Sequence, residues 1–116
     1  MNRQAAEKRG RGAETLACWF LRLKGWRILA RRARMHGGEV DIVARRGRTL
    51  AFIEVKARAT AEEAAFALDD WRLRRVVTAA ERLTPRYMRE GDDVRIDALF
   101  IVPYRWPRHL TNVWQG

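Results

Sequence analysis

Three residues in the first half of the chain have the types and spacing of a site for metal-dependent phosphate chemistry. Asp41 lies in segment 39–44 (EVDIVA), and Glu54 and Lys56 lie in segment 49–57 (TLAFIEVKA). Carboxylate oxygens are the ligands that Mg²⁺ and Mn²⁺ prefer, and such a metal can activate water and stabilise charge on a phosphate. A neighbouring lysine can orient or deprotonate that water. The three residues are therefore candidate catalytic groups, with Asp41 and Glu54 as candidate metal ligands.

The two segments must form a hairpin if these side chains are to meet. Each alternates apolar and polar residues as a half-buried strand does, and the connection 45–48 (RRGR) suits a tight turn. A loop centred on Arg46–Gly47 predicts the pairs Ala44 with Thr49, Asp41 with Phe52 and Glu39 with Glu54. This register makes Asp41 and Glu54 diagonal neighbours on one face, with Cβ atoms less than about 7–8 Å apart.

Polar residues on this face also have an ordinary explanation, because a hairpin that buries one face normally solvates the other. The acids, however, crowd together on a basic protein, and carboxylates repel one another unless a cation joins them. Zinc is excluded, because Cys18 is alone and His36 and His109 lie far apart in the sequence. For Glu39 the pattern leaves two roles open, support of the site or simple solvation.

The net charge of the chain points to an anionic partner. Its 116 residues include 24 Lys and Arg against 14 Asp and Glu, which gives a formal net charge of +10. A basic domain of this kind most often binds nucleic acid, although basic residues can also serve solubility alone. Clusters of arginine suit phosphate contacts that position a nucleic acid without reading its sequence. The predicted nucleic-acid contacts are Arg31, Arg32, Arg45, Arg46, Arg72 and Arg75.

Length and composition support one globular domain. The chain is 47% hydrophobic, and a domain of its length buries roughly two-thirds of its unfolded surface. Residues 1–11 lack periodicity and predict a disordered basic arm, which leaves 12–116 as the domain. One cysteine excludes an internal disulfide, and no apolar run reaches the roughly 18 residues of a membrane span. We therefore expect no membrane partner and a cytoplasmic location.

Hydrophobic periodicity predicts the elements that position the candidate residues. The order is helix, three strands, helix and one or two strands, with ranges 12–24, 26–30, 39–44, 49–57, 69–83, 94–102 and 110–114. Residues 58–68 are expected to form an irregular or partly helical connection. A helix that crosses over between the third and fourth strands favours their parallel pairing. We therefore expect an α/β fold with a mixed sheet of four to five strands flanked by helices.

These motifs resemble those of the restriction-endonuclease-like nucleases, the PD-(D/E)XK superfamily. The shared pattern is Glu14 on the first helix, then Asp41, then Glu54-Val55-Lys56. More closely, the chain is similar to the YraN family of small bacterial proteins of uncharacterised function. The matching segments span residues from about 10 to 114 and are Gly12-Ala-Glu14, Gly25-Trp-Arg-Ile-Leu, Gly38-Glu-Val-Asp-Ile-Val, Phe52-Ile-Glu-Val-Lys-Ala-Arg58 and Arg95-Ile-Asp97.

The resemblance implies a restriction-endonuclease-like core of helix, three strands, helix and strand. It implies that Asp41 and Glu54 bind Mg²⁺ or Mn²⁺, that Lys56 is catalytic and that Glu14 lies near the metal. For Glu14 an alternative stays open, an acid favoured by the dipole at a helix N-terminus. The superfamily includes the archaeal-type Holliday-junction resolvases, and an activity of that kind would need two active sites and hence a dimer.

One position departs from the family pattern, which commonly has a lysine early in the second helix. The residues here are Asp69-Asp70-Trp71-Arg72, so Arg72 is the nearest basic substitute. An arginine can hold phosphate but cannot act as a base. Asp97 matches the family pattern on a later strand, where we favour a structural hydrogen-bonding role.

The leading hypothesis is a metal-dependent endonuclease acting on DNA, including branched or processed DNA. The alternative is a nucleic-acid-binding protein that keeps the fold without catalysis, and a third hypothesis is a module whose arginines bind an acidic protein. Trp26, Trp71 and Trp106 are candidates for stacking on exposed bases, although each is more often a packing residue.

Overall fold

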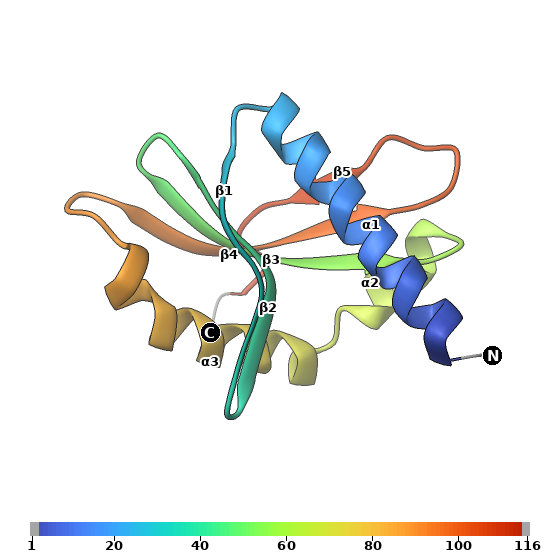
Figure 1. Cartoon of the computed structure of the whole chain (residues 1–116), viewed down its shortest axis with the longest axis horizontal. Coiled ribbons are helices and arrows are strands. Elements are labelled where there is room, and N and C mark those ends of the chain that lie inside the picture. Colours follow the sequence, from blue (N-terminus) through green and yellow to red (C-terminus); the bar gives the residue numbers. More distant parts are fainter. Residues whose placement is uncertain (1–2, 115–116) are drawn as a thin grey trace.

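The computed structural model of the chain describes residues 3–114, with side chains from residue 12 onward. Five strands form one sheet in chain order, and three helices flank it (Figure 1). The elements are α1 (Arg3–Leu23), β1 (Arg27–Met35), β2 (Gly38–Arg46), β3 (Thr49–Ala57), α2 (Ala61–Ala67), α3 (Asp70–Tyr87), β4 (Asp93–Ile101) and β5 (Arg108–Leu110). The β3 and β4 strands pair in parallel and the other neighbours are antiparallel, which confirms the predicted α/β fold with a mixed sheet. Within the described residues no helix is long and apolar enough to cross a membrane.

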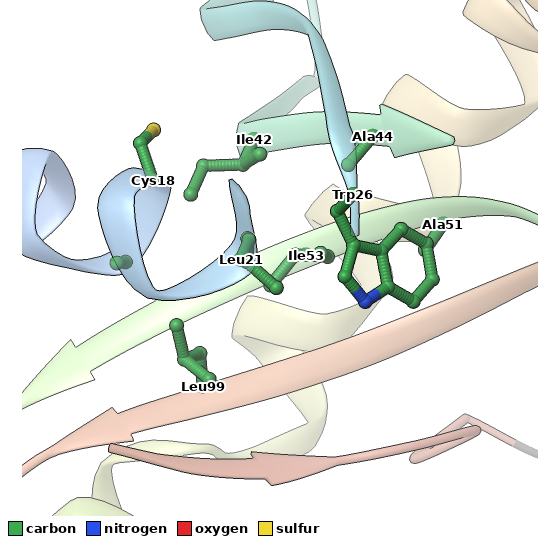
Figure 2. Packing of buried hydrophobic residues seen from close by; sticks show 9 residues of the cluster. Cys18, Leu21, Trp26, Ile42, Ala44, Ala51, Ile53 and Leu99 are labelled. Carbon is green, nitrogen blue, oxygen red and sulfur yellow. The ribbon is translucent and has the colours of Figure 1, made fainter. Parts of the chain in front are cut away.

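The central β2–β3 hairpin is buried on both faces, because α1 and α3 cover opposite sides of the sheet (Figure 1). Adjacent strand residues point to opposite faces, so Phe52 faces α3 while Ile53 faces α1. The α1 side, part of which Figure 2 shows, includes Ala17, Cys18, Leu21, Ile42, Ala51 and Leu99. The α3 side includes Val43, Leu50, Leu73, Val76 and Ala79. Water therefore does not reach the buried polar side chains of this hairpin, and each of them needs a hydrogen-bonding or charged partner within the protein.

The β2–β3 hairpin turns at Gly47–Arg48, so the predicted register is wrong by two residues. Ala44 pairs with Ala51 and not with Thr49. Gly47 has a φ of 60°, which suits glycine as the first loop residue of a type II′ turn. Because the shift is even, every side chain keeps its predicted face. The same register, continued beyond its last pair, places Asp41 level with Glu54 instead of diagonal to it.

The first helix begins much earlier than expected. It starts at Arg3, and not at residue 12, so it includes most of the segment predicted to be a basic arm. Residues 1–2 and the side chains of 3–11 lie outside the description of the structure. The division of the chain into an arm and a domain stays a prediction.

The first strand is longer than expected and contains a bulge. Its register with β2 shifts between Ile28 and Ala30, and Arg32 has a φ of 51°. A bulge bends a strand and increases its twist without ending the pairing. Pairing with β2 continues past the bulge to Met35, instead of stopping at Ala30.

The crossover between β3 and β4 carries two helices, and α2 is the helical part of the connection 58–68, which was expected to be irregular or partly helical. The Thr60 side chain caps α2 by accepting a backbone N–H, and the Asp69 side chain caps α3 in the same way. The α3 helix continues through Pro85 to Tyr87, beyond the predicted end at Leu83. The predicted parallel pairing of the third and fourth strands is confirmed.

The far end of the β1–β2 hairpin packs directly on α3. A Cβ atom added to Gly38 would lie 2.8 Å from the backbone nitrogen of Ala79 and 2.8 Å from the carbonyl oxygen of Arg75. Real Cβ atoms do not approach backbone atoms this closely, so this contact requires glycine. The approach holds the next residue, Glu39, beside the arginines of α3.

Candidate functional site

Asp41 and Glu54 meet where the ladder between β2 and β3 ends. The last pair of that ladder is Ile42 with Ile53. One residue further, Oδ2 of Asp41 accepts the backbone N–H of Val55 at 2.7 Å. This bond turns the carboxylate of Asp41 toward β3, where it is hydrogen-bonded to the carboxyl of Glu54. The two acids on which the predicted site depends are therefore adjacent.

Glu54 is buried in surroundings that disfavour its negative charge. Only 6% of the residue is exposed. Burial raises the pKa of Glu54 to about 9, and the hydrogen bond and negative charge of Asp41 add to the rise, while the positive charge of Lys56 opposes it. The carboxyl therefore carries a proton at neutral pH when no cation is bound nearby.

Lys56 completes the cluster from the same strand as Glu54. It lies two residues further along β3, so the two side chains share a face. Its Nζ lies 3.7 Å from Oε2 of Glu54, and both residues are buried. The three predicted catalytic residues, Asp41 included, are therefore brought together by the hairpin.

The donor set of this cluster fits a hard divalent cation. Mg²⁺ is commonly held through one or two carboxylates, with water and substrate phosphate as the other ligands. A cation shared by Asp41 and Glu54 would replace the proton on Glu54 and remove the repulsion between two ionised carboxylates. Among the described residues, no group of three or more His, Cys, Asp or Glu side chains is arranged to hold a metal. A metal at this site would therefore depend on two carboxylates alone among those side chains.

Glu14 lies in the interior of α1 and is paired with two arginines of β1. Its Oε1 lies 3.3 Å from Nε of Arg31, and its Oε2 lies 3.0 Å from Nε of Arg32. The alternative of an acid at a helix N-terminus is wrong, because α1 begins at Arg3. Both carboxylate oxygens are engaged by guanidinium groups, and so Glu14 is not grouped with Asp41 and Glu54.

Arg45 was predicted to contact nucleic acid, and the structure corrects this prediction. The side chain is buried, and its two terminal nitrogens donate to the Asp92 carboxylate at 2.9 and 2.7 Å and to the Tyr87 carbonyl at 2.8 Å. The hydrogen bond from Arg45 lowers the pKa of Asp92 to about 2. Arg45 therefore joins β2 to the connection between α3 and β4. The sequence carries no signal for this partner, which lies 47 positions away.

Asp97 has the structural role that the sequence favoured. It is fully buried, and its carboxylate accepts bonds from Arg95 at 3.0 Å and from the Asn112 N–H at 2.8 Å, with Nε2 of His109 at 2.7 Å. Burial opposes ionisation, but the bonds from His109, Arg95 and Asn112 outweigh it and lower the pKa of Asp97. Arg95 could have been found from its spacing, because residues two apart on a strand share a face. Nothing in the sequence indicates His109.

The remaining predicted contacts, Arg46, Arg72 and Arg75, lie at the surface with weak partners. The guanidinium of Arg46 stacks over Trp26, 4.7 Å from the ring centroid. Nitrogens of Arg72 and Arg75 lie 3.8 and 3.9 Å from Oε1 of Glu39. Glu39 is thus half-exposed and ion-paired, and Arg72 approaches Glu39 and not Glu54.

Trp71 joins the same surface. The guanidinium carbons of Arg72 and Arg75 each lie 5.4 Å from the centroid of its ring, and the residue is exposed. Exposed ion pairs contribute little to stability, so these arginines remain free to contact phosphate. Trp26, by contrast, is a buried packing residue against α1 and β2 (Figure 2).

Comparison with known proteins identifies the family. The model of the "Uncharacterised protein family UPF0102" matches residues 13–101. The chain belongs to this family. The "UPF0102 protein" of Sphingopyxis alaskensis is 59% identical over 115 residues, which cover 99% of each chain. Those of Rhizorhabdus wittichii and Erythrobacter litoralis are 56% and 48% identical, and each match covers at least 99% of both chains. The resemblance to the YraN family is thereby confirmed.

The UPF0102 match includes Asp41, Glu54 and Lys56, which we call the acidic cluster. Asp97 also lies inside the matched residues, whereas β5 lies beyond their end. The names of these UPF0102 relatives state no activity. A function for this chain therefore has to be argued from the chemistry of its own side chains.

Proposed function

We propose that this protein is a metal-dependent endonuclease that hydrolyses phosphodiester bonds of DNA, including branched or processed DNA. The observation that carries the proposal is the buried cluster of Asp41, Glu54 and Lys56. A carboxyl whose pKa is raised to about 9 beside a second acid is costly to keep in a fold. A divalent cation bound by the two acids would offset this cost.

Each residue of the cluster has its own role in the proposed reaction. Asp41 and Glu54 would hold Mg²⁺ or Mn²⁺, which polarises the phosphate and lowers the pKa of a water. The Val55 N–H fixes one oxygen of Asp41, so this carboxylate is oriented in advance. The Lys56 ammonium, on the same face, stabilises the negative charge that develops on the phosphate and helps to orient the water.

Nucleic acid is the anion that the charge of the molecule favours. The net charge is +10, and arginines of α3 lie near the acidic cluster, where Arg72 and Arg75 approach Glu39, two residues before Asp41 on β2. Such arginines bind phosphates through charge without reading base sequence. We therefore propose DNA as the partner and the cytoplasm as the place of action.

A cleavage assay on single-stranded, duplex and four-way-junction DNA with Mg²⁺ or Mn²⁺ tests the proposal. We expect Glu54→Gln and Lys56→Met each to slow cleavage at least about 100-fold, because each removes a charge that acts on the phosphate or its metal. The matched control is Glu62→Gln, which removes one exposed carboxylate from α2 and should leave cleavage unchanged. Calorimetry with Mn²⁺ in the absence of DNA should show binding to wild type and to Lys56→Met but not to Glu54→Gln. Unchanged cleavage by both cluster variants would remove these residues from the reaction.

A second candidate function is nucleic-acid binding without catalysis. It is favoured by the engagement of Glu14 with Arg31 and Arg32, which leaves two carboxylates for a metal instead of three. Salt-sensitive DNA binding with no metal-dependent cleavage of any of the three DNA forms would establish this function instead.

A further inference from the structure

The loop between β4 and β5 presents two aromatic side chains to solvent. Tyr104 is fully exposed and Trp106 is 85% exposed. Tyr104 also has a φ of 64°, a left-handed conformation that costs an ordinary residue roughly 1 kcal/mol or more. Neither ring gains packing energy in the fold, so both are available for a partner.

These rings line a pocket between the loop and the start of α2, which we call the loop pocket. Its volume is about 540 Å³, within the range of sites that hold a small organic group. Its lining includes Tyr104, Arg105, Trp106, Arg108, Phe100 and Ala61. The loop extends from the sheet on the side where α2 lies (Figure 1).

The loop pocket is close to the acidic cluster. Phe100, which lines it, is the β4 partner of Lys56 in the parallel pair. Partners in a parallel pair lie side by side on one face of neighbouring strands, which are about 4.8 Å apart. The loop pocket therefore opens one strand away from Lys56, at the carboxyl ends of β3 and β4. Ligands of open α/β sheets commonly bind at such ends.

Charge distinguishes the loop pocket from a second one on α2. Arg105 and Arg108 line the loop pocket, and no acidic residue does. The second pocket, about 490 Å³, contains the exposed ring of Phe66 and one arginine, Arg58, but Glu62 and Glu63 also line it. The two carboxylates outnumber the arginine and repel a phosphate backbone, so of these two pockets the loop pocket has the charge that suits nucleic acid.

We propose that the loop pocket binds an unpaired base of a nucleic-acid strand, stacked on Trp106 and Tyr104, while Arg105 and Arg108 contact the adjoining phosphates. Stacking needs an unpaired base, because a paired base is already stacked within its duplex. This inference rests on the proposed function and narrows its substrate to strands with unpaired bases near the bond that is cut.

Fluorescence anisotropy with the full-length protein in EDTA tests this inference without cleavage. The probes are three fluorescein-labelled 12-mers: oligo-dT, a duplex, and an abasic strand with the same phosphates and no bases. We expect Trp106→Ala to weaken binding of oligo-dT roughly 10-fold, since that ring stacks on a base, and to leave the other two probes unchanged. Trp106→Phe should retain most of the affinity. The matched control is Phe66→Ala, which removes an equally exposed ring from the acidic pocket and should change nothing.

Three results would overturn the inference while leaving the proposed nuclease intact. The first is binding of oligo-dT by Trp106→Ala with wild-type affinity. The second is an equal loss of affinity for oligo-dT and for the abasic strand, and the third is displacement of oligo-dT by poly-glutamate at matched charge. Either of the last two means that charge and not stacking drives binding. Failure of wild type to bind any of the three probes would overturn the proposed function together with this inference.

Discussion

Asp97 and Glu54 are buried acids on neighbouring parallel strands, and the fold treats them in opposite ways. Asp97 accepts bonds from two cationic or polar side chains and a backbone N–H, and its pKa is lowered. Glu54 faces another carboxylate and a lysine nitrogen 3.7 Å away, and its pKa is raised to about 9. Burial is common to both, so the donors around each acid decide the sign of the shift.

This difference separates an acid that stabilises the fold from an acid that the fold tolerates. The folded protein holds Asp97 in its ionised form, which makes this carboxylate part of the structure. The folded protein disfavours the ionised form of Glu54, which leaves that carboxyl available to a cation from solution. Clusters of the second kind are more often found at functional sites.

The largest effect is expected from Asp97→Ala, which should lower the free energy of unfolding by about 3–5 kcal/mol. The change leaves Arg95 and His109 without their buried acceptor. Urea titration followed by circular dichroism measures it. The control is Asp41→Ala, which removes one backbone bond but also the negative charge that helps to raise the pKa of Glu54, and should change the free energy far less. Equal losses for both variants would contradict the contrast between the two acids.

Glu54→Gln should have the opposite sign and raise the free energy of unfolding by roughly 1–3 kcal/mol at pH 8 without metal, since the wild type must take up a proton at Glu54 on folding at this pH and the neutral glutamine does not. The folded-state pKa of Glu54 lies above its ordinary 4.5, so its stabilising contribution is present below pH 4.5 and is lost as the pH rises toward 9. Thermal melts of wild type in EDTA should therefore show falling stability over this range, and those of Glu54→Gln a flatter profile.

Asp97 gives the opposite pH dependence. Its pKa is lowered from 3.8, so its contribution is present above that value and is lost as the pH falls below it. Acid melts of Asp97→Asn should lack this component.

For Glu54, a Glu54→Gln variant that is less stable than wild type at pH 8 would contradict the prediction, because it would show that the ionised carboxylate is part of the stable fold.

The smallest effect is expected from His109→Ala, which should cost about 1–2 kcal/mol, because it removes one of the donors to Asp97 and leaves the others. His109→Gln restores a donor and should recover part of the loss. Chemical denaturation of the two variants in parallel measures the difference. A full 3–5 kcal/mol loss in His109→Ala would mean that His109 alone determines the state of Asp97.

Local patterns predicted most of the fold. The bounds of β3 and the faces of Asp41, Glu54 and Lys56 follow from alternation, which survives a register error of two residues. The register itself depends on which pair of residues forms the turn, and a positive φ at Gly47 decides this. The bulge at Ile28 depends on tertiary packing, which period and propensity do not encode, whereas the start of α2 has a local signal in Thr60 and Glu63, which have the spacing of a capping box.

The candidate site was predictable to the extent that it is local. The acidic cluster comes from one hairpin, and so spacing alone assembled it. Arg45 looked like any other member of an exposed basic run, because its partner Asp92 is remote in sequence. Glu14 was expected near a metal, but the bulged β1 strand brings Arg31 and Arg32 to it instead. Both outcomes depend on long-range packing.

The strand order has a kinetic consequence. The Asp41–Val55 bond spans 14 positions, and the bonds of Asp97 to His109 and Asn112 span 12 and 15, so each acid cluster closes within its own antiparallel unit. The parallel join between those units requires the chain to close residues 58–92 into a crossover, which costs more loop entropy than either hairpin. We therefore expect formation of the β3–β4 pair to be the non-local step that limits the folding rate, and substitutions along it should slow refolding more than substitutions within either cluster.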